Sequence, residues 1–233
     1  MKRIYLLAAF CLPMAAGANE SALEILARIV TAFKAHESLS YTATLHWKPA
    51  TSNDTLAPVT ATVHLLRDSR DTLWGGYYWI GKDTRYNSYG FYDCEHRYIV
   101  LERIRLAYKE EPTSVFGLYH LYNGFMPVPF LKVQDLEKEF ATSTATRLPD
   151  TVVGGVACLA VRYTLQDYYG PREVQLYVSA KDHLPVLRKE WWTYDPGKIQ
   201  YSEFRFLAME FDKVTREQFS PAQIPGDYKI EAR

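Results

Sequence analysis

Histidine, cysteine and carboxylate side chains are the residues that could carry catalysis or hold a metal, and they are scattered along this chain. A zinc protease would show HExxH, a serine hydrolase GxSxG and a nucleotide-binding protein a glycine-rich phosphate loop; none of these motifs occurs. The six histidines do not pair at the spacing of metal ligands: His36, His46, His64, His96, His120 and His183. Asp93, Glu95 and Glu102 are conceivable as paired carboxylates, but charged turns explain them as well. We therefore predict no catalytic residue, no metal site, no cofactor and a protein that is not an enzyme.

Two cysteines belong to the working protein, because the third, Cys11, lies in the export signal described below. Cys94 and Cys158 are too far apart in the sequence to form a CxxC redox or zinc motif. In an oxidising compartment they form a disulfide across the sheet, or they stay separate buried thiols that pack as small hydrophobes. The sequence leaves both alternatives open.

The first 18 residues show the three parts of a secretory signal peptide. Lys2 and Arg3 are followed by an uncharged apolar stretch, 4–16, and then by small residues ending at Ala18. The apolar stretch is shorter than the about 20 residues that a membrane helix needs. We predict cleavage after residue 18, export, and a mature domain at 19–233 without a transmembrane segment.

The charge balance excludes several classes of partner. The chain has 27 basic and 27 acidic residues, and loss of Lys2 and Arg3 leaves a mature net charge of −2. Nucleic-acid binding calls for a basic patch or stripe, and docking on anionic lipid calls for clustered basic residues. We therefore predict no nucleic-acid partner and no electrostatic membrane docking.

An amphipathic helix is predicted at 21–36. Ser21 and Glu24 form a capping box, which satisfies free backbone donors at a helix N-terminus. An apolar stripe follows at helical spacing: Leu23, Leu26, Val30 and Phe33. Such a helix has to lie on an apolar surface.

Most of the remaining chain alternates apolar and polar residues with the period of two that is typical of strands. Ten strands are predicted: 41–47, 59–65, 73–81, 86–93, 98–101, 103–108, 156–165, 172–180, 185–194 and 199–211. A helical insertion interrupts them, with one short helix near 113–122 and another that begins at Pro129 and turns Val133, Leu136 and Phe140 inward. Residues 219–230 are predicted to form an extended tail. The fold class is α+β: a highly curved antiparallel sheet, an incomplete β-barrel, with helices over its concave face.

Aromatic residues are the most unusual feature of the sequence, since eight of the 23 residues from Asp71 to Asp93 are aromatic. Tyr77, Tyr78 and Trp79 are consecutive, so their rings point to both faces of one strand. We predict that Tyr77 and Trp79 face outward, and that a second set faces an apolar cavity on the concave side. The predicted cavity residues are Trp47, Val63, Leu65, Tyr78, Ile80, Tyr98 and Phe204. A one-residue bulge near Gly75 and Gly76 would reverse this assignment.

The order of these elements resembles the periplasmic lipoprotein-carrier-like superfamily, the group around LolA, LolB and RseB. The resemblance covers nearly all of 21–231 and is carried by SALEILARIVTAFKAHESLSYTATLHW, RDSRDTLWGGYYWI, FYDCEHRYIVLERIRLAYKE, VVGGVACLAVRYTL, EVQLYVSAKDHLPVLRKEWW and the closing YSEFRFLAMEF with IPGDYKI. It implies a stand-alone member without a thioredoxin domain. It also implies a helical lid over an apolar cavity, which related proteins use for acyl chains.

Two functions follow from this reading. The first is a periplasmic carrier or sensor that binds an acyl chain or another apolar ligand. The second is a periplasmic interaction module with a filled core, which acts as the partner of an envelope protein. We expect the helix at 21–36 to be fixed and residues 113–128 to act as the gate of a cavity.

Overall fold

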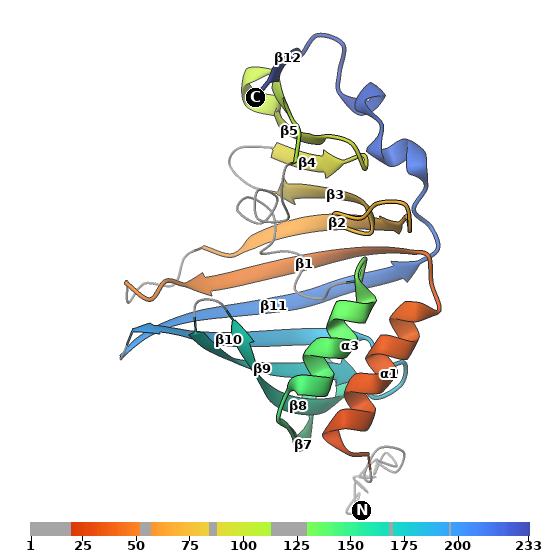
Figure 1. The fold of residues 1–233 in the computed structure, drawn as a ribbon. Helices are drawn as coiled ribbons and strands as arrows, with labels where there is room; N and C mark the ends of the chain where they lie inside the picture. The colour runs from red at the N-terminus through yellow and green to blue at the C-terminus, as the bar shows by residue number, and fades with distance from the viewer. Residues whose placement is uncertain (1–19, 52–56, 84–87, 113–129, 168–169, 196) are drawn as a thin grey trace, which may run out of the picture.

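The computed structural model describes residues 20–51, 57–83, 88–112, 130–167, 170–195 and 197–233. The twelve strands of these described residues all belong to one open, curved sheet (Figure 1). The strands are β1 (Ser38–Lys48), β2 (Val59–Arg67), β3 (Gly76–Asp83), β4 (Ser88–Tyr92), β5 (Arg97–Leu101), β6 (Leu106–Glu110), β7 (Ala145–Val153), β8 (Val156–Asp167), β9 (Gly170–Ser179), β10 (Pro185–Asp195), β11 (Lys198–Phe211) and β12 (Lys229–Ala232).

The strand order is β12-β6-β5-β4-β3-β2-β1-β11-β10-β9-β8-β7. Every neighbouring pair is antiparallel except β12 and β6, which are parallel. Because β11 returns from the end of the second half to pair with β1, residues far apart in sequence meet at the centre of the sheet. The predicted fold class, α+β with a curved sheet, is confirmed.

Two of the twelve strands were not among the ten predicted. β7 is an edge strand that contains Pro149 and is mostly exposed, so it lacks the alternation of a half-buried strand. β12 is a four-residue edge strand that pairs only with β6. β12 is defined by a distant partner, whereas β7 forms a hairpin with β8 through the turn at Gly154 and Gly155 and was missed because its residues are mostly exposed.

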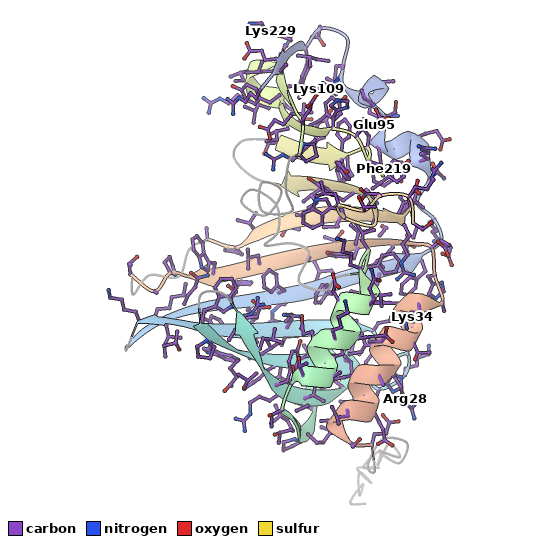
Figure 2. The ribbon with its side chains drawn as sticks, in the orientation of Figure 1. Arg28, Lys34, Glu95, Lys109, Phe219 and Lys229 are labelled. Atoms are coloured by element: carbon purple, nitrogen blue, oxygen red, sulfur yellow. The ribbon has the colours of Figure 1, made fainter. Side chains whose placement is uncertain are left out.

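Helices α1 (Ala22–Lys34) and α3 (Val133–Thr142) lie side by side across one face of the sheet, in front of β7 to β11 in Figure 1. This face is called the inner face below, and the opposite one the outer face. α1 packs against β7, β8 and α3, and Lys34, labelled in Figure 2, pairs with Glu137 of α3 at 2.5 Å. The predicted capping box of Ser21 and Glu24 is present.

The buried stripe of α1 differs from the predicted one at its first residue. Leu23 is 56% exposed, whereas Ala22, Ile25, Leu26, Ile29, Val30 and Phe33 are buried. A helix turns about 100° per residue, so a stripe centred on Ile25 and Ile29 leaves Leu23 on the far side. α3 buries Val133, Leu136 and Phe140 as predicted but begins at Val133. The predicted helix near 113–122 and the predicted gate at 113–128 lie outside the described residues.

A turn held by one carboxylate sets the start of β3. Asp71 accepts hydrogen bonds from the backbone N–H groups of Leu73, Trp74 and Gly76, so the strand begins at Gly76 rather than at Leu73. Gly76 has φ 147°, and a Cβ there would lie 2.1 Å from the Leu66 carbonyl oxygen. Only glycine fits this close approach.

The segment after β11 covers the outer face at the other end of the sheet. It contains two 3-10 turns, η3 (Arg216–Phe219) and η4 (Pro221–Gln223), and then β12. The predicted extended tail is therefore more structured than expected. Figure 2 shows Phe219 beside this end of the sheet, where it packs with Tyr77 and Val214.

The connection between β5 and β6 also differs from the predicted hairpin, which began its second arm at Arg103. Glu102–Ile104 form a 3-10 turn (η1), and Arg105 follows with a φ of 52°. A single left-handed residue reverses the chain in a short space. β6 therefore starts at Leu106.

Candidate functional site

Five of the predicted cavity residues lie together in the main core on the inner face. Val63 and Leu65 of β2, Tyr78 and Ile80 of β3, and Phe204 of β11 are all buried in one apolar cluster with α1 and α3. Tyr77 and Trp79 do not belong to this inner core. They pack in smaller apolar clusters on the outer face. No bulge reverses the parity, because β2 and β3 pair without a shift in register from Gly76 to Asp83. That these five side chains line a ligand cavity stays a prediction.

Trp47 and Tyr98 do not join this core. Trp47 is near the end of β1, opposite Ser202, and is 38% exposed. Tyr98 was predicted to face the concave side and this is wrong: it packs on the outer face, stacked on Phe91 at 4.7 Å. Its face is set by the turn before β5, in which Cys94 adopts a φ of 73°. A left-handed residue in a turn is not visible in the alternation pattern.

Both cysteines are free thiols, so the disulfide alternative is not realised and the alternative of separate thiols holds. Cys94 is half-buried beside Tyr77, and burial together with the charge of Asp71 raises its pKa to about 12. Cys158 is buried in β8, and burial raises its pKa as well. Thiols with raised pKa values are poor nucleophiles.

A cluster of buried charges lies on the inner face, at β10, and was not predicted. Arg188 is 3% exposed and Glu190 4%, and the Arg188 Nε donates to Glu190 Oε1 at 2.5 Å. Both point inward because they are paired across the strands with the core residues Leu176 and Val174 of β9. β10 thus places an ion pair among apolar side chains.

Two neighbouring side chains extend this cluster toward the end of the strands. Arg172 of β9 has its Nη1 3.5 Å from Glu190 Oε2, and its guanidinium lies over the Trp192 ring at 4.9 Å. Burial alone would raise the pKa of Glu190, but Arg188 and Arg172 hold it below its usual value. The Glu190 carboxylate is therefore the charged partner of both arginines.

Tyr163 of β8 and Glu139 of α3 complete the group. The Tyr163 ring meets Phe140 edge-on at 5.4 Å. Burial raises the pKa of Glu139, although Arg188 and Arg172 lower it and the Tyr163 hydroxyl lies close enough to lower it too. Within the described part of the chain, neither the Tyr163 hydroxyl nor Glu139 Oε1 has a hydrogen-bond partner of good distance and angle. We call Glu139, Tyr163, Arg172, Arg188, Glu190 and Trp192 the inner charged cluster.

One signal in the sequence could have revealed this cluster. Residues 185–194 were predicted as a strand, and within it Arg188, Glu190 and Trp192 occupy alternate positions. An alternating set on one face of a central strand is expected to be apolar. Charged residues there, in a strand with neighbours on both sides, indicate a buried polar site.

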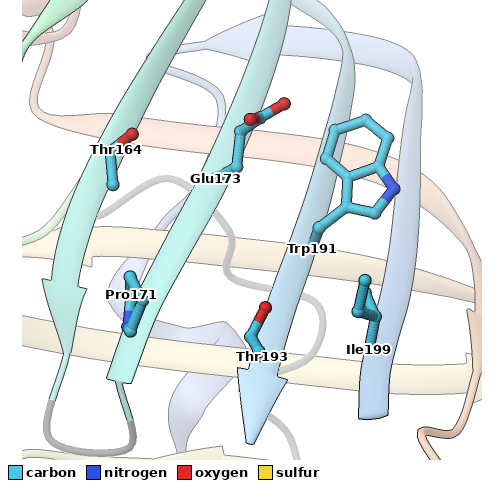
Figure 3. A pocket seen from close by; sticks show the side chains of 6 residues that line it. All are labelled: Thr164, Pro171, Glu173, Trp191, Thr193 and Ile199. Carbon is cyan, nitrogen blue, oxygen red and sulfur yellow. The ribbon is translucent and has the colours of Figure 1, made fainter. Parts of the chain in front are cut away.

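The outer face carries an open hollow of about 430 Å³ at the same end of the strands (Figure 3). Its lining residues come from β8 to β11: Thr164, Pro171, Glu173, Trp191, Thr193 and Ile199. Trp191 and Trp192 are consecutive and so face opposite sides of the sheet. None of the predicted cavity residues lines this hollow.

Within the described residues, no group of three or more histidine, cysteine, aspartate or glutamate side chains is arranged to hold a metal ion. Among the helices of the described residues, none is both long enough and apolar enough to cross a bilayer.

No protein-family model matches the chain, and no curated protein matches it. Two of the solved structures that share its fold have TM-scores above 0.5. An uncharacterised conserved protein from Thermus thermophilus aligns with a TM-score of 0.51 and 10% identity, over 91% of this chain and 99% of the other. The lipoprotein LppX of Mycobacterium tuberculosis aligns with a TM-score of 0.52 and 10% identity, over 83% and 97%.

A structure of MucB gives a TM-score of 0.49 at 14% identity, over 88% of this chain and 62% of the other. At such identities, a comparison establishes a shared architecture and nothing about activity. The architecture itself agrees with the sequence resemblance. The chain shares the fold of LppX and of the Thermus thermophilus protein.

Proposed function

We propose that this chain is a non-catalytic periplasmic carrier or sensor, exported with loss of residues 1–18, that binds an acyl chain or another apolar ligand on the inner face of its sheet. The observation that carries the proposal is the width of the apolar inner face. Core side chains continue from Ile99 of β5 to Leu159 of β8, whereas α1 packs against the sheet mainly at β7 and β8, with Phe33 reaching Phe211 of β11. An apolar surface wider than its helices suits a ligand chain.

The energetics favour such binding without any catalytic group. Each CH₂ of an acyl chain that leaves water contributes about 0.8 kcal/mol. A chain of ordinary length would therefore bind through apolar contact alone. The absence of a metal cluster in the described residues is compatible with this role but is not an argument for it.

A second candidate is the interaction module for an envelope protein. It is favoured by the tight packing of Val63, Ile80 and Phe204, which leaves each of these side chains at most 5% exposed. A core as full as this needs no ligand. In that case a partner protein, and not a lipid, would be the physiological ligand.

Native mass spectrometry of protein purified from its own periplasm separates the two candidates. A co-purified mass that is released by solvent extraction supports the carrier. Delipidated protein should then enhance the fluorescence of N-phenyl-1-naphthylamine. A Leu45→Trp substitution, at the half-buried edge of the inner core, should weaken the binding of this probe by about tenfold.

Leu207→Trp is the matched control, since Leu207 is exposed on the same sheet. It should leave the probe affinity unchanged. Equal effects of the two substitutions, or no co-purified mass and no probe binding, would exclude the carrier and favour the interaction module.

A further inference from the structure

The inner charged cluster interrupts a face that is otherwise apolar. On β9 the inward residues next to it are Val174 and Leu176, and on β11 the neighbour of Arg188 is Phe204. A buried ion pair is often no more stabilising than apolar residues of the same volume. Stability of the fold therefore does not explain why β10 places charges here.

The cluster is also incomplete as a hydrogen-bond network. Buried polar atoms in folded proteins almost always have a partner. Within the described residues, the Tyr163 hydroxyl and Glu139 Oε1 lack one, and Tyr163 is only 1% exposed. These two atoms come from different elements, β8 and α3, and lie within reach of one another, so an oxyanion bound between them would compete with their mutual contact.

The balance of charges in the cluster is compatible with a bound anion. Arg172 and Arg188 keep their charge at any ordinary pH, and Glu190 neutralises one of them. Burial favours the protonated form of Glu139. When that carboxyl is protonated, the cluster carries one excess positive charge and two hydroxyl donors, from Tyr163 and from Glu139. When it is ionised, the cluster is electrically neutral, and the two arginines and the Tyr163 hydroxyl remain as donors.

We propose that the inner charged cluster binds the oxyanion head, a carboxylate or a phosphate monoester, of an amphiphile whose apolar chain lies along the neighbouring inner face. This inference rests on the proposed function and adds the chemical class of the ligand. The oxyanion accepts hydrogen bonds from Tyr163 and Glu139 and pairs with the arginines, which suit carboxylate and phosphate geometry. Leu165, Val174 and Phe204 supply the adjoining apolar surface.

The test compares oleate with oleyl alcohol on delipidated, full-length mature protein, by isothermal titration calorimetry. The two probes share one chain and differ in the charged head. Oleate should bind at least about tenfold more tightly, because charge-assisted hydrogen bonds are roughly twice as strong as neutral ones. Inorganic phosphate, which has no chain, should not compete with oleate at equal concentration.

Two substitutions should remove this preference without removing chain binding. Tyr163→Phe deletes only a hydroxyl and keeps the ring against Phe140, and Arg172→Gln deletes one charge at the partly exposed side of the cluster. In both variants the affinity for oleate should fall to within about threefold of that for oleyl alcohol, whose own affinity should not change.

Arg205→Gln is the matched control, because Arg205 also pairs with a glutamate, Glu203 at 2.7 Å, but is exposed. It should keep the full preference for oleate. Equal binding of oleate and oleyl alcohol by the unmodified protein would overturn this inference and leave the proposed function standing. Binding of neither probe would overturn both, and competition by phosphate alone at the concentration of oleate would show a site for free oxyanions and overturn the amphiphile.

Discussion

The two ends of the sheet differ in how many of their faces are buried. At β7 to β11, helices α1 and α3 cover the inner face, while the outer face carries polar pairs such as Lys189 with Glu203. At β3 to β6 the outer face is also buried, because the segment after β11 lies on it and inserts Phe219 and Ile224 (Figures 1 and 2).

This difference explains the consecutive rings near the start of β3. Tyr78 belongs to the inner core, whereas Tyr77 packs against Phe219 at 5.3 Å and Trp79 lies near Tyr89. A strand with rings on both faces needs cover on both sides. The rings of β3 therefore belong to two cores, one on each face of the sheet.

The largest effect is expected at the helix-covered end. Phe33→Ala removes a fully buried ring that contacts Phe130 and Phe211. The free energy of unfolding should fall by about 4 kcal/mol, the usual cost of a large cavity in a core. Urea unfolding followed by circular dichroism measures it. Leu23→Ala, on the exposed side of α1, should change stability by less than about 0.5 kcal/mol, and a comparable loss in both variants would contradict the assigned packing.

A smaller effect is expected on the outer face. Phe219→Ala empties the ring site against Tyr77, but this outer cluster is small and its cover is a single short segment. We expect a loss of about 2 kcal/mol, with local opening of the segment rather than of the whole sheet. Amides of 229–232 should exchange faster, while those of α1 keep their protection.

Lys213→Ala, a substitution at an exposed residue of the same segment, is the control for Phe219→Ala. It should leave the exchange of 229–232 unchanged. If Phe219→Ala destabilised α1 as strongly as 229–232, the outer cluster would be part of the main core and the two ends would not differ.

The assignment of the β3 rings to the two faces depends on the turn at Gly76. Replacing this glycine tests whether the turn fixes that assignment. Gly76→Ala brings a Cβ against the Leu66 carbonyl oxygen at a φ of 147°. Backbone strain alone costs about 1–3 kcal/mol, and the clash with the backbone of Leu66 adds to it, so the midpoint of urea unfolding should fall. Gly226→Ala, where a Cβ meets nothing within 4 Å and φ is not positive, should be neutral. A neutral Gly76→Ala would mean that the turn can move and the parity of β3 is not fixed there.

The smallest effect concerns pH. Burial raises the pKa of Glu139, so the folded protein retains a proton that the unfolded chain has lost. This stabilisation is complete below the ordinary glutamate pKa of about 4.3 and is lost as the pH rises through the higher pKa of the folded state. Glu139→Gln should therefore flatten the dependence of the urea midpoint on pH.

Glu137→Gln is the control for this pH effect, because Glu137 is on the same helix but its side chain is exposed. The decline of stability with rising pH should persist in that variant. The same slope in Glu139→Gln as in the unmodified protein would show that Glu139 is charged in the folded state and that the cluster has no excess positive charge.

The sequence by itself determined the local elements. The capping box of Ser21 and Glu24 begins α1, and alternation at β1, β2 and β8 to β11 predicts which residues point inward. These features depend on interactions between residues a few positions apart, so a short segment of sequence is enough to predict them. The fold class followed from their order, and the placement of Tyr77 and Tyr78 followed from alternation once the start of β3 was known.

Only the tertiary structure decided the features that join distant residues. The face of Tyr98 depends on a left-handed turn at Cys94, and the strand character of β12 depends on its distant partner β6. The inner charged cluster unites Glu139 of α3 with Tyr163 of β8 and Glu190 of β10. Burial and neighbouring charge set the protonation of such groups, and both arise from the packing of the whole sheet against its helices, which no local pattern records.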